Sequence, residues 1–148
     1  MSTTGGNNPR VVLDTNVYVS AILFGGTPEI IFNLGRRGLI TILTSRPILV
    51  EISRVLSTKM KMERPDVRDA LITIRQTAEL ILPLKKISAI RADDPDNRIL
   101  ECAVEGRADA IVTGDKKHVR ALGSFKGIPI YLPAEFIQAS RQGRFPVS

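Results

Sequence analysis

The sequence has few of the residues that build disulfide, zinc and base-stacking sites. It contains one cysteine, Cys102, which excludes an internal disulfide and a cysteine-rich zinc site. We expect Cys102 to be a small core residue, because it falls in an apolar helical stretch. With no Trp, two Tyr and five Phe, the chain is a poor candidate for a protein that stacks bases on aromatic side chains. The one histidine, His118, has no nucleophile motif around it, and we expect it on the surface.

Several sequence patterns are also missing. No stretch reaches the roughly 18 apolar residues that a membrane span needs. The first nine residues are polar and uncharged, with no apolar run behind them, which argues against a secretory signal. Neither a P-loop nor a GxGxxG pattern is present, so no nucleotide cofactor is indicated. These absences predict a protein of the reducing cytoplasm with no membrane partner.

The 148 residues fit one domain, and 43% hydrophobic with 24% charged residues is typical of a globular chain. The net charge is 21 − 15 = +6, which favours an anionic partner, although such a charge also serves solubility. We expect a flexible tail over residues 1–9, one domain over residues 10–140 and a mobile C-terminal tail over residues 141–148.

Short apolar runs alternate with helical stretches. The runs predict strands at residues 11–13, 39–43, 81–84, 110–113 and 128–131, with 81–84 at a sheet edge because Pro83 interrupts it. Helices are predicted at residues 17–24, 28–37 behind a Thr27 cap, 45–56, 65–78, 95–105 and 133–140, with a helical turn at 119–122. The alternation predicts an α/β domain with a mostly parallel sheet.

Two carboxylates follow predicted strands. Asp14 comes directly after residues 11–13, and Asp115 follows the strand at 110–113. Ligand sites in open parallel sheets lie beyond the carboxyl ends of the strands, so we expect both side chains to face one crevice. Turn formation or helix capping by Asp is the open alternative at each position.

A third carboxylate, Glu51, lies inside the apolar stripe of its predicted helix. It stands three residues after Ile48 and four before Val55. A carboxylate on a buried face is costly unless it is paired or holds a metal ion. Pairing with Arg54, or bending toward solvent, is the open alternative.

A fourth carboxylate, Asp96, shares a helix face with Ile99 and Leu100 in the first turn. The helix macrodipole also favours Asp there, which is the alternative reading. Asp94, followed by Pro95, fits the N-cap, and it is the fallback acidic residue if the helix is turned differently. Glu101 is rotated off this face, and Asp109 stands at the opposite end of the sheet.

Four carboxylates within a few ångströms repel one another. At an effective dielectric of 20, each pair about 4 Å apart costs roughly 4 kcal/mol. A divalent cation would neutralise such a cluster, and all-oxygen ligands suit Mg²⁺ or Mn²⁺ rather than Zn²⁺. The pattern predicts metal-assisted hydrolysis of a phosphodiester.

An ordered set of motifs carries a family resemblance. The chain reads VVLDTN at residues 11–16, then Glu51, then DPDNRILE at 94–101 and IVTGD at 111–115. Together these resemble a PIN domain, in particular the PIN-family toxin component of bacterial and archaeal toxin–antitoxin systems, similar in role to VapC. The resemblance runs from about residue 10 to residue 137, and its pieces are specific as an ordered set rather than singly.

The resemblance implies a three-layer α/β/α sandwich with a central, mostly parallel sheet and a ribonuclease dependent on Mg²⁺ or Mn²⁺. The family's acidic positions fall on Asp14, Glu51, Asp96 and Asp115. Asn16 would orient Asp14 or a bound water, and Thr113 matches a small polar residue of the family. Many relatives have another acid where Asn97 stands. Family members often form homodimers and are neutralised by a small antitoxin that occupies the site.

Lys116, Lys117 and Arg120 are predicted to lie at the rim of this site and to contact RNA phosphates, although such residues are also common on solvated faces. The leading hypothesis is a metal-dependent endoribonuclease, the toxin of a toxin–antitoxin pair. One alternative is a catalytically silent PIN-like module that binds RNA or protein. Another is a phosphatase of the haloacid-dehalogenase type, which Asn16 disfavours because that chemistry usually has a second Asp there.

Overall fold

The computed structural model describes residues 8–87, 95–114 and 119–145 of the chain. The strands are β1 (Arg10–Leu13), β2 (Thr41–Ser45), β3 (Glu79–Ile81), β4 (Ala110–Val112), β5 (Ser124–Phe125) and β6 (Ile128–Tyr131). The helices are α1 (Thr15–Leu23), α2 (Gly26–Arg36), α3 (Arg46–Arg54), α4 (Arg64–Thr77), α5 (Asp96–Glu105) and α6 (Pro133–Arg141). A π-helix, η2 (Val55–Lys59), continues α3, and a 3₁₀ turn, η3 (Arg120–Leu122), precedes β5.

One six-stranded sheet, in the order β3-β2-β1-β4-β6-β5, forms the centre of the molecule. All neighbouring strands are parallel except β5 and β6, which are antiparallel. The apolar residues Val11, Val12 and Leu13 of β1 are fully buried. A continuous apolar strand is typical of a parallel sheet that is covered on both faces.

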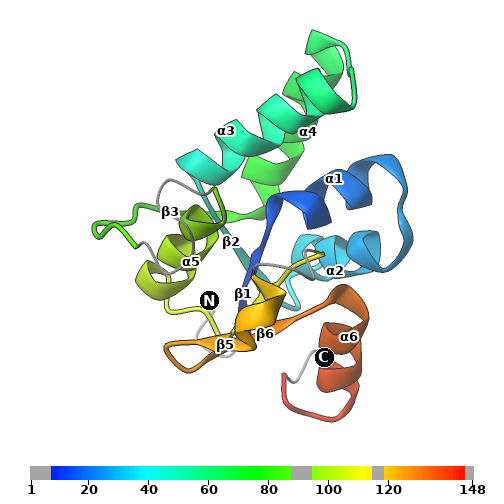
Figure 1. Ribbon diagram of the computed structural model, residues 1–148. Coiled ribbons are helices and arrows are strands. Elements are labelled where there is room, and N and C mark those ends of the chain that lie inside the picture. The colour runs from blue at the N-terminus through cyan, green and yellow to red at the C-terminus, as the bar shows by residue number, and fades with distance from the viewer. Residues whose placement is uncertain (1–7, 88–94, 115–118, 146–148) are drawn as a thin grey trace.

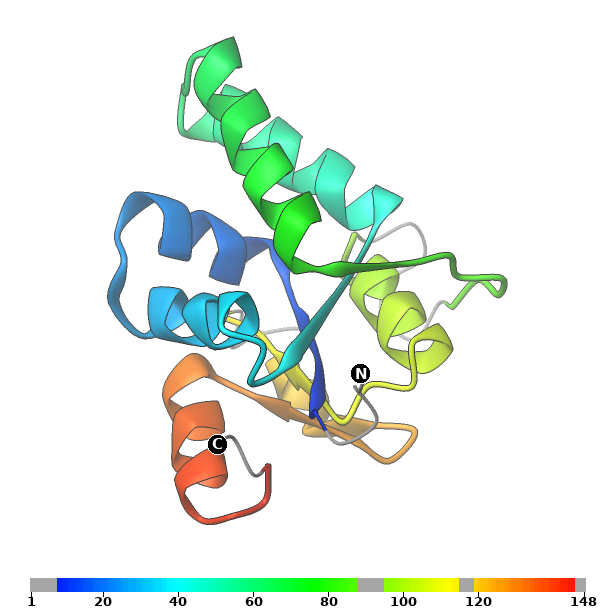
Figure 2. The same cartoon turned by 180° about the vertical axis from the view of Figure 1, so that it is seen from behind.

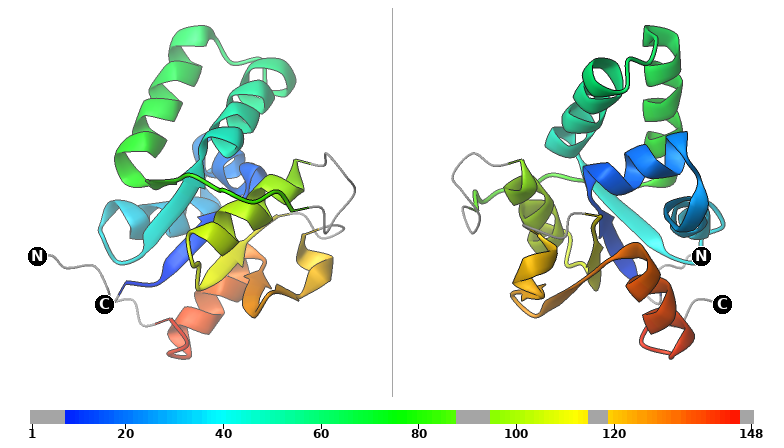
Figure 3. Two further views of the ribbon diagram at one scale, coloured as in Figure 1. Left: turned by 90° about the vertical axis from the view of Figure 1, so that its left-hand side faces the viewer. Right: turned by 45° about the vertical axis from the view of Figure 1, so that its right-hand side comes forward.

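Helices cover both faces of this sheet (Figures 1 and 2). α5 packs on one face, while α1, α2 and α6 lie on the other. α3 and α4 form a hairpin that extends past the sheet (Figure 3). The predicted three-layer α/β/α sandwich with a mostly parallel sheet is therefore confirmed. No single described helix is long and apolar enough to cross a membrane. Among the described helices, only α1 and α2 taken together have the length and composition of a membrane span, and they are bent by 100° relative to each other.

Several predicted boundaries shift for local reasons. α1 begins at Thr15 rather than residue 17, because the Asp14 side chain caps it. α2 begins at Gly26 behind Gly25, whose φ of 73° suits glycine, and Thr27 is not its cap. β2 begins at Thr41 rather than residue 39, because the amide of Leu39 still bonds the Leu34 carbonyl at the end of α2.

The sequence patterns missed two features near the C-terminus. β5 has two residues, too short for a periodic signal. Residues 141–145 were expected in a mobile tail, but Phe145 is buried and stacks on Phe136 with ring centroids 5.5 Å apart. Arg141 belongs to α6. The fold therefore extends to Phe145, because this aromatic contact holds the end of the chain against α6.

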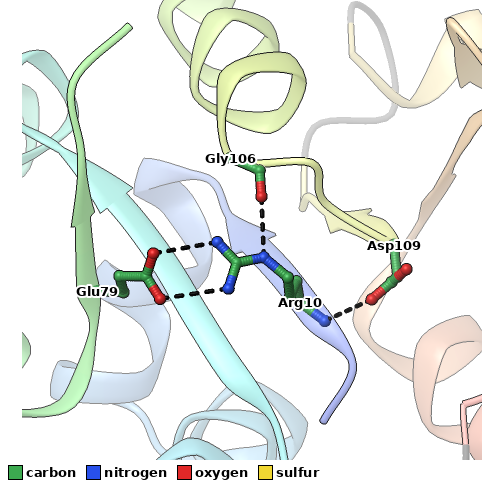
Figure 4. Close-up of polar contacts among 4 residues, drawn as sticks. All are labelled: Arg10, Glu79, Gly106 and Asp109. Carbon is green, nitrogen blue, oxygen red and sulfur yellow. Dashed lines mark hydrogen bonds and ion pairs between the residues drawn. The ribbon is translucent and has the colours of Figure 1, made fainter. Parts of the chain in front are cut away.

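The amino end of the sheet is held together by Arg10 (Figure 4). Its guanidinium makes two bonds to Glu79, of 3.2 and 3.1 Å, and its Nε donates to the Gly106 carbonyl at 2.9 Å. Its amide donates to Asp109 at 2.7 Å. Asp109 thus stands at the end of the sheet opposite the predicted site. Arg10 links β1 to β3 and to the end of α5.

Candidate active site

The carboxyl ends of the parallel strands form a row of aligned residues. Leu13 of β1 pairs with Val112 of β4, so the next residues, Asp14 and Thr113, stand side by side. On the other flank, the β1–β2 register continued to its end places Asp14 level with Ser45. This edge is where open α/β sheets bind ligands.

Asp14 is 2% exposed, and hydrogen bonds fix both of its carboxylate oxygens. Oδ1 accepts the amides of Asn16 at 2.9 Å and Val17 at 3.3 Å, which caps α1. Oδ2 accepts the hydroxyl of the fully buried Thr113. The capping role left open by the sequence is therefore present. Carboxylate oxygens have about four lone-pair sites between them, so capping does not exhaust their capacity as ligands.

Asn16 and Gly114 lie on the solvent side of Asp14 and Thr113. Asn16 is exposed, and its backbone amide, rather than its side chain, is seen to hold Asp14. A Cβ placed on Gly114 would lie 3.8 Å from the Cβ of Asn16. The ends of β1 and β4 thus present a buried carboxylate behind an exposed amide.

Glu51 is bound by an arginine. Its carboxylate, 23% exposed, takes two hydrogen bonds from Arg54, of 3.0 and 2.8 Å, one turn further along α3. The guanidinium's own pKa is raised by these bonds to Glu51. This is the pairing that the sequence left open as the alternative to a metal ligand.

Asp96 is the first residue of α5, behind Pro95 at the N-cap position. Because α5 connects two parallel strands, its N-terminus lies at the carboxyl edge of the sheet, the edge that holds Asp14. The deeper polar position belongs to Asn97, which is 0% exposed, whereas Asp96 is half-buried. Asp96 shares its helix face with the buried Ile99 and Leu100, as predicted from their spacing, but is itself only half-buried. The N-cap prediction for Asp94 lies outside the described residues.

Glu101 has a structural role. It is 6% exposed and accepts the amide of Ile87 at 2.8 Å and a guanidinium N–H of Arg98 at 3.0 Å. It therefore ties the chain that leaves β3 to the side of α5.

Within residues 8–87, 95–114 and 119–145, no three His, Cys, Asp or Glu side chains are grouped so that they could hold a metal ion. Asp115, the fourth predicted ligand, lies outside these ranges. The predicted residues Lys116, Lys117 and His118 lie outside them as well.

The comparison with family models decides the family. Residues 10–117 match the model described as a PIN domain. The chain belongs to the PIN domain family. The matched range includes each of the four predicted acidic positions, Asp14, Glu51, Asp96 and Asp115.

This PIN domain is similar to two other proteins, one in sequence and one in fold. An uncharacterised protein of Methanocaldococcus jannaschii is 33% identical over 112 residues, covering 72% of this chain and 71% of that protein. The fold resembles a chain in the crystal structure of VapBC2 from Rickettsia felis bound to a DNA fragment from their promoter. That match has a TM-score of 0.60 and 18% identity, and covers 82% of this chain and 96% of that one.

Arg120 of the PIN domain is engaged with a carboxylate. It makes two 2.9 Å bonds to Glu135, and these lower the Glu135 pKa, as does the bond from the Leu132 amide. This guanidinium is partly neutralised, which weakens the expectation that it contacts phosphate.

Two buried hydroxyls of the PIN domain were not singled out from the sequence. The Tyr18 phenol and the Thr44 hydroxyl are buried beside each other, and neither is paired with any other group within the part of the chain that the structure describes. Burial raises the pKa of Tyr18, and the charge of Asp14 acts in the same direction. Tyr18 stands four residues after Asp14, and residues at this spacing share one face of a helix. That spacing was the one feature of the sequence that could have placed Tyr18 near Asp14.

Proposed function

We propose that this PIN domain is a metal-dependent endoribonuclease that hydrolyses phosphodiester bonds of RNA. One observation carries the proposal: the buried carboxylate of Asp14, fixed by Thr113 at the carboxyl edge of the sheet. Family membership supports it, and favours it over the phosphatase alternative.

A divalent cation would be held by Asp14, Asp96 and Asp115. Carboxylate oxygens suit Mg²⁺ and Mn²⁺, so the donor chemistry of these residues fits the ion. Asp115 is needed to complete the set, because the described residues alone do not group three ligands. Glu51 would join through lone pairs that its two bonds to Arg54 leave unused, or after leaving Arg54. Such a cation would supply Lewis-acid chemistry, namely polarisation of the phosphate and activation of water.

The protein's own residues would prepare the site in advance. The two backbone amides and Thr113 hold Asp14 in one orientation, so no rearrangement is needed when substrate arrives. Asn16, exposed beside Asp14, would donate a hydrogen bond from its side-chain amide to a substrate phosphate. This bond would hold the RNA in a fixed position relative to Asp14. These residues lie directly after β4 or in the first turn of α1, which follows β1.

We also propose that the chain is the toxin of a toxin–antitoxin pair, acts in the cytoplasm and forms a homodimer. The fold shared with a VapBC2 chain supports the first part. A cognate antitoxin would then be its protein partner.

Cleavage of a fluorescent RNA by the full chain, with Mg²⁺, with Mn²⁺ and with EDTA, tests the function. Asp14→Asn should abolish cleavage while keeping the helix cap, because Asn is an equally good N-cap residue. Asp69→Asn, at an exposed carboxylate on α4, is the matched control and should cleave like the wild type. Cleavage that persists in EDTA or in Asp14→Asn would refute the proposal.

A further inference from the structure

A basic groove lies beside the candidate active site, on the flank opposite Arg120. It has a volume of about 450 Å³ and forms where β2 passes into α3, where the chain leaves β3, and along α5. These three segments meet at the left of the molecule in Figure 1. Its charged lining residues are Arg46, Lys85, Lys86, Arg98 and Glu101.

The positive charge of the groove is largely uncompensated. Arg46, Lys85 and Lys86 are exposed, and none of them forms a salt bridge to a described residue. Arg98 pairs with Glu101 at 3.0 Å, while its buried Nε has no hydrogen-bond partner among the described residues. Four cations against one carboxylate leave an excess of three positive charges along the lining.

The groove is level with Asp14 along the sheet edge. Ser45 at the end of β2 pairs with Ile81 at the end of β3, and both stand in the same row as Asp14. Strands lie about 4.8 Å apart, so β2 is about 5 Å and β3 about 10 Å from the line of β1. Arg46 follows Ser45 directly. An extended chain that ran from Asp14 along the sheet edge toward β3 would pass over the cations of this groove.

The groove also has apolar surface. Leu82 and Leu84, which line it, are 66% and 84% exposed. A single-stranded nucleic acid offers phosphates to cations and the apolar faces of its sugars and bases to such side chains. Guanidinium and ammonium groups bind phosphate by complementary geometry and by charge, respectively.

We propose that this groove binds the phosphodiester backbone of a single-stranded nucleic acid and holds it on the β2–β3 side of Asp14. The choice of nucleic acid over an acidic peptide rests on the proposed nuclease function, because the groove adjoins the site assigned to that chemistry. The substrate strand would then cross the sheet edge from β3 toward β1.

Binding without cleavage tests this groove. Fluorescence anisotropy of a labelled single-stranded RNA would be recorded in EDTA over a range of salt concentrations. The double variant Lys85→Gln/Lys86→Gln is compared with Arg68→Gln/Arg75→Gln, which removes two exposed cations from α4 and leaves the same net charge. Thermal unfolding of both variants checks the fold.

Each lost phosphate contact on a single strand lowers the salt slope by about 0.7, so the groove variant should lose about 1.4 and bind roughly tenfold more weakly at 0.15 M salt. The control variant should bind within about twofold of the wild type. Equal losses in the two variants, or no loss in the groove variant, would overturn the proposal. So would poly-glutamate of the same length binding with the same dependence on Lys85 and Lys86.

The test also separates this inference from the proposed function. A wild-type chain that binds RNA through the groove in EDTA, yet cleaves nothing with metal, leaves the groove supported and refutes the nuclease. A chain that cleaves with metal while the groove variant binds normally refutes the groove alone.

Discussion

Replacing Asp14 separates its structural role from its proposed chemical role. Asp14→Ala removes the cap from α1, which costs about 0.5–2 kcal/mol. It also leaves the buried Thr113 hydroxyl without its acceptor, which costs about 1–3 kcal/mol. We expect the free energy of unfolding to fall by about 1.5–5 kcal/mol.

Asp14→Asn keeps an acceptor oxygen for the amides of Asn16 and Val17 and is nearly isosteric. Its free energy of unfolding should lie within about 1 kcal/mol of the wild type. Both variants should lose cleavage, because neither has the carboxylate charge.

Urea unfolding followed by circular dichroism measures both changes, with equal slopes against urea showing that the unfolded states are comparable. In a Thr113→Val background, Asp14→Ala should cost only the capping part. An alanine variant as stable as the wild type, or an asparagine variant as unstable as the alanine one, would refute this assignment of the hydrogen bonds.

Three further predictions follow from the contacts of Arg10, Glu135 and Cys102. Arg10→Ala should lower the free energy of unfolding by about 1 kcal/mol, since the partly exposed pair with Glu79 and the bond to Gly106 are lost together; urea unfolding checks this. Arg120 lowers the pKa of Glu135, so their pair should stabilise the fold above pH 4.5, the ordinary pKa of Glu. This stabilisation should be lost as the pH falls through the lowered pKa. The free energy of unfolding should therefore differ slightly less between pH 7 and pH 3 in Glu135→Gln than in the wild type. Burial raises the pKa of Cys102 to about 12, so the native thiol should resist a thiol reagent at pH 8 and react only in urea; rapid labelling of the native protein would contradict its burial.

The part of the site that rests on strand order was predictable from the sequence. Asp14 follows an apolar run, and the rule that parallel strands present their carboxyl ends at one edge places it near the chain that follows β4. The structure brings Thr113 to it. The pairing of Glu51 with Arg54 was visible as an i, i+3 spacing, but spacing alone could not decide between a metal and an arginine.

The groove was not predictable from the sequence. Arg46 and Lys85 are far apart in the chain, and only the pairing of β2 with β3 brings them to one place. Burial of Phe145 was missed for a related reason, since its contact with Phe136 depends on how α6 ends. In each case a tertiary contact, rather than a local pattern, decides the position.

Mn²⁺ binding measured by electron paramagnetic resonance tests most directly whether the carboxylates converge. The wild type would be compared with Asp14→Asn, Asp96→Asn and Asp115→Asn, with Asp69→Asn as the control. Loss of even an outer-shell partner weakens metal binding about 10–100-fold, so each ligand variant should bind at least roughly tenfold more weakly. A wild type that leaves Mn²⁺ free, or ligand variants that bind it as tightly as Asp69→Asn, would contradict the account.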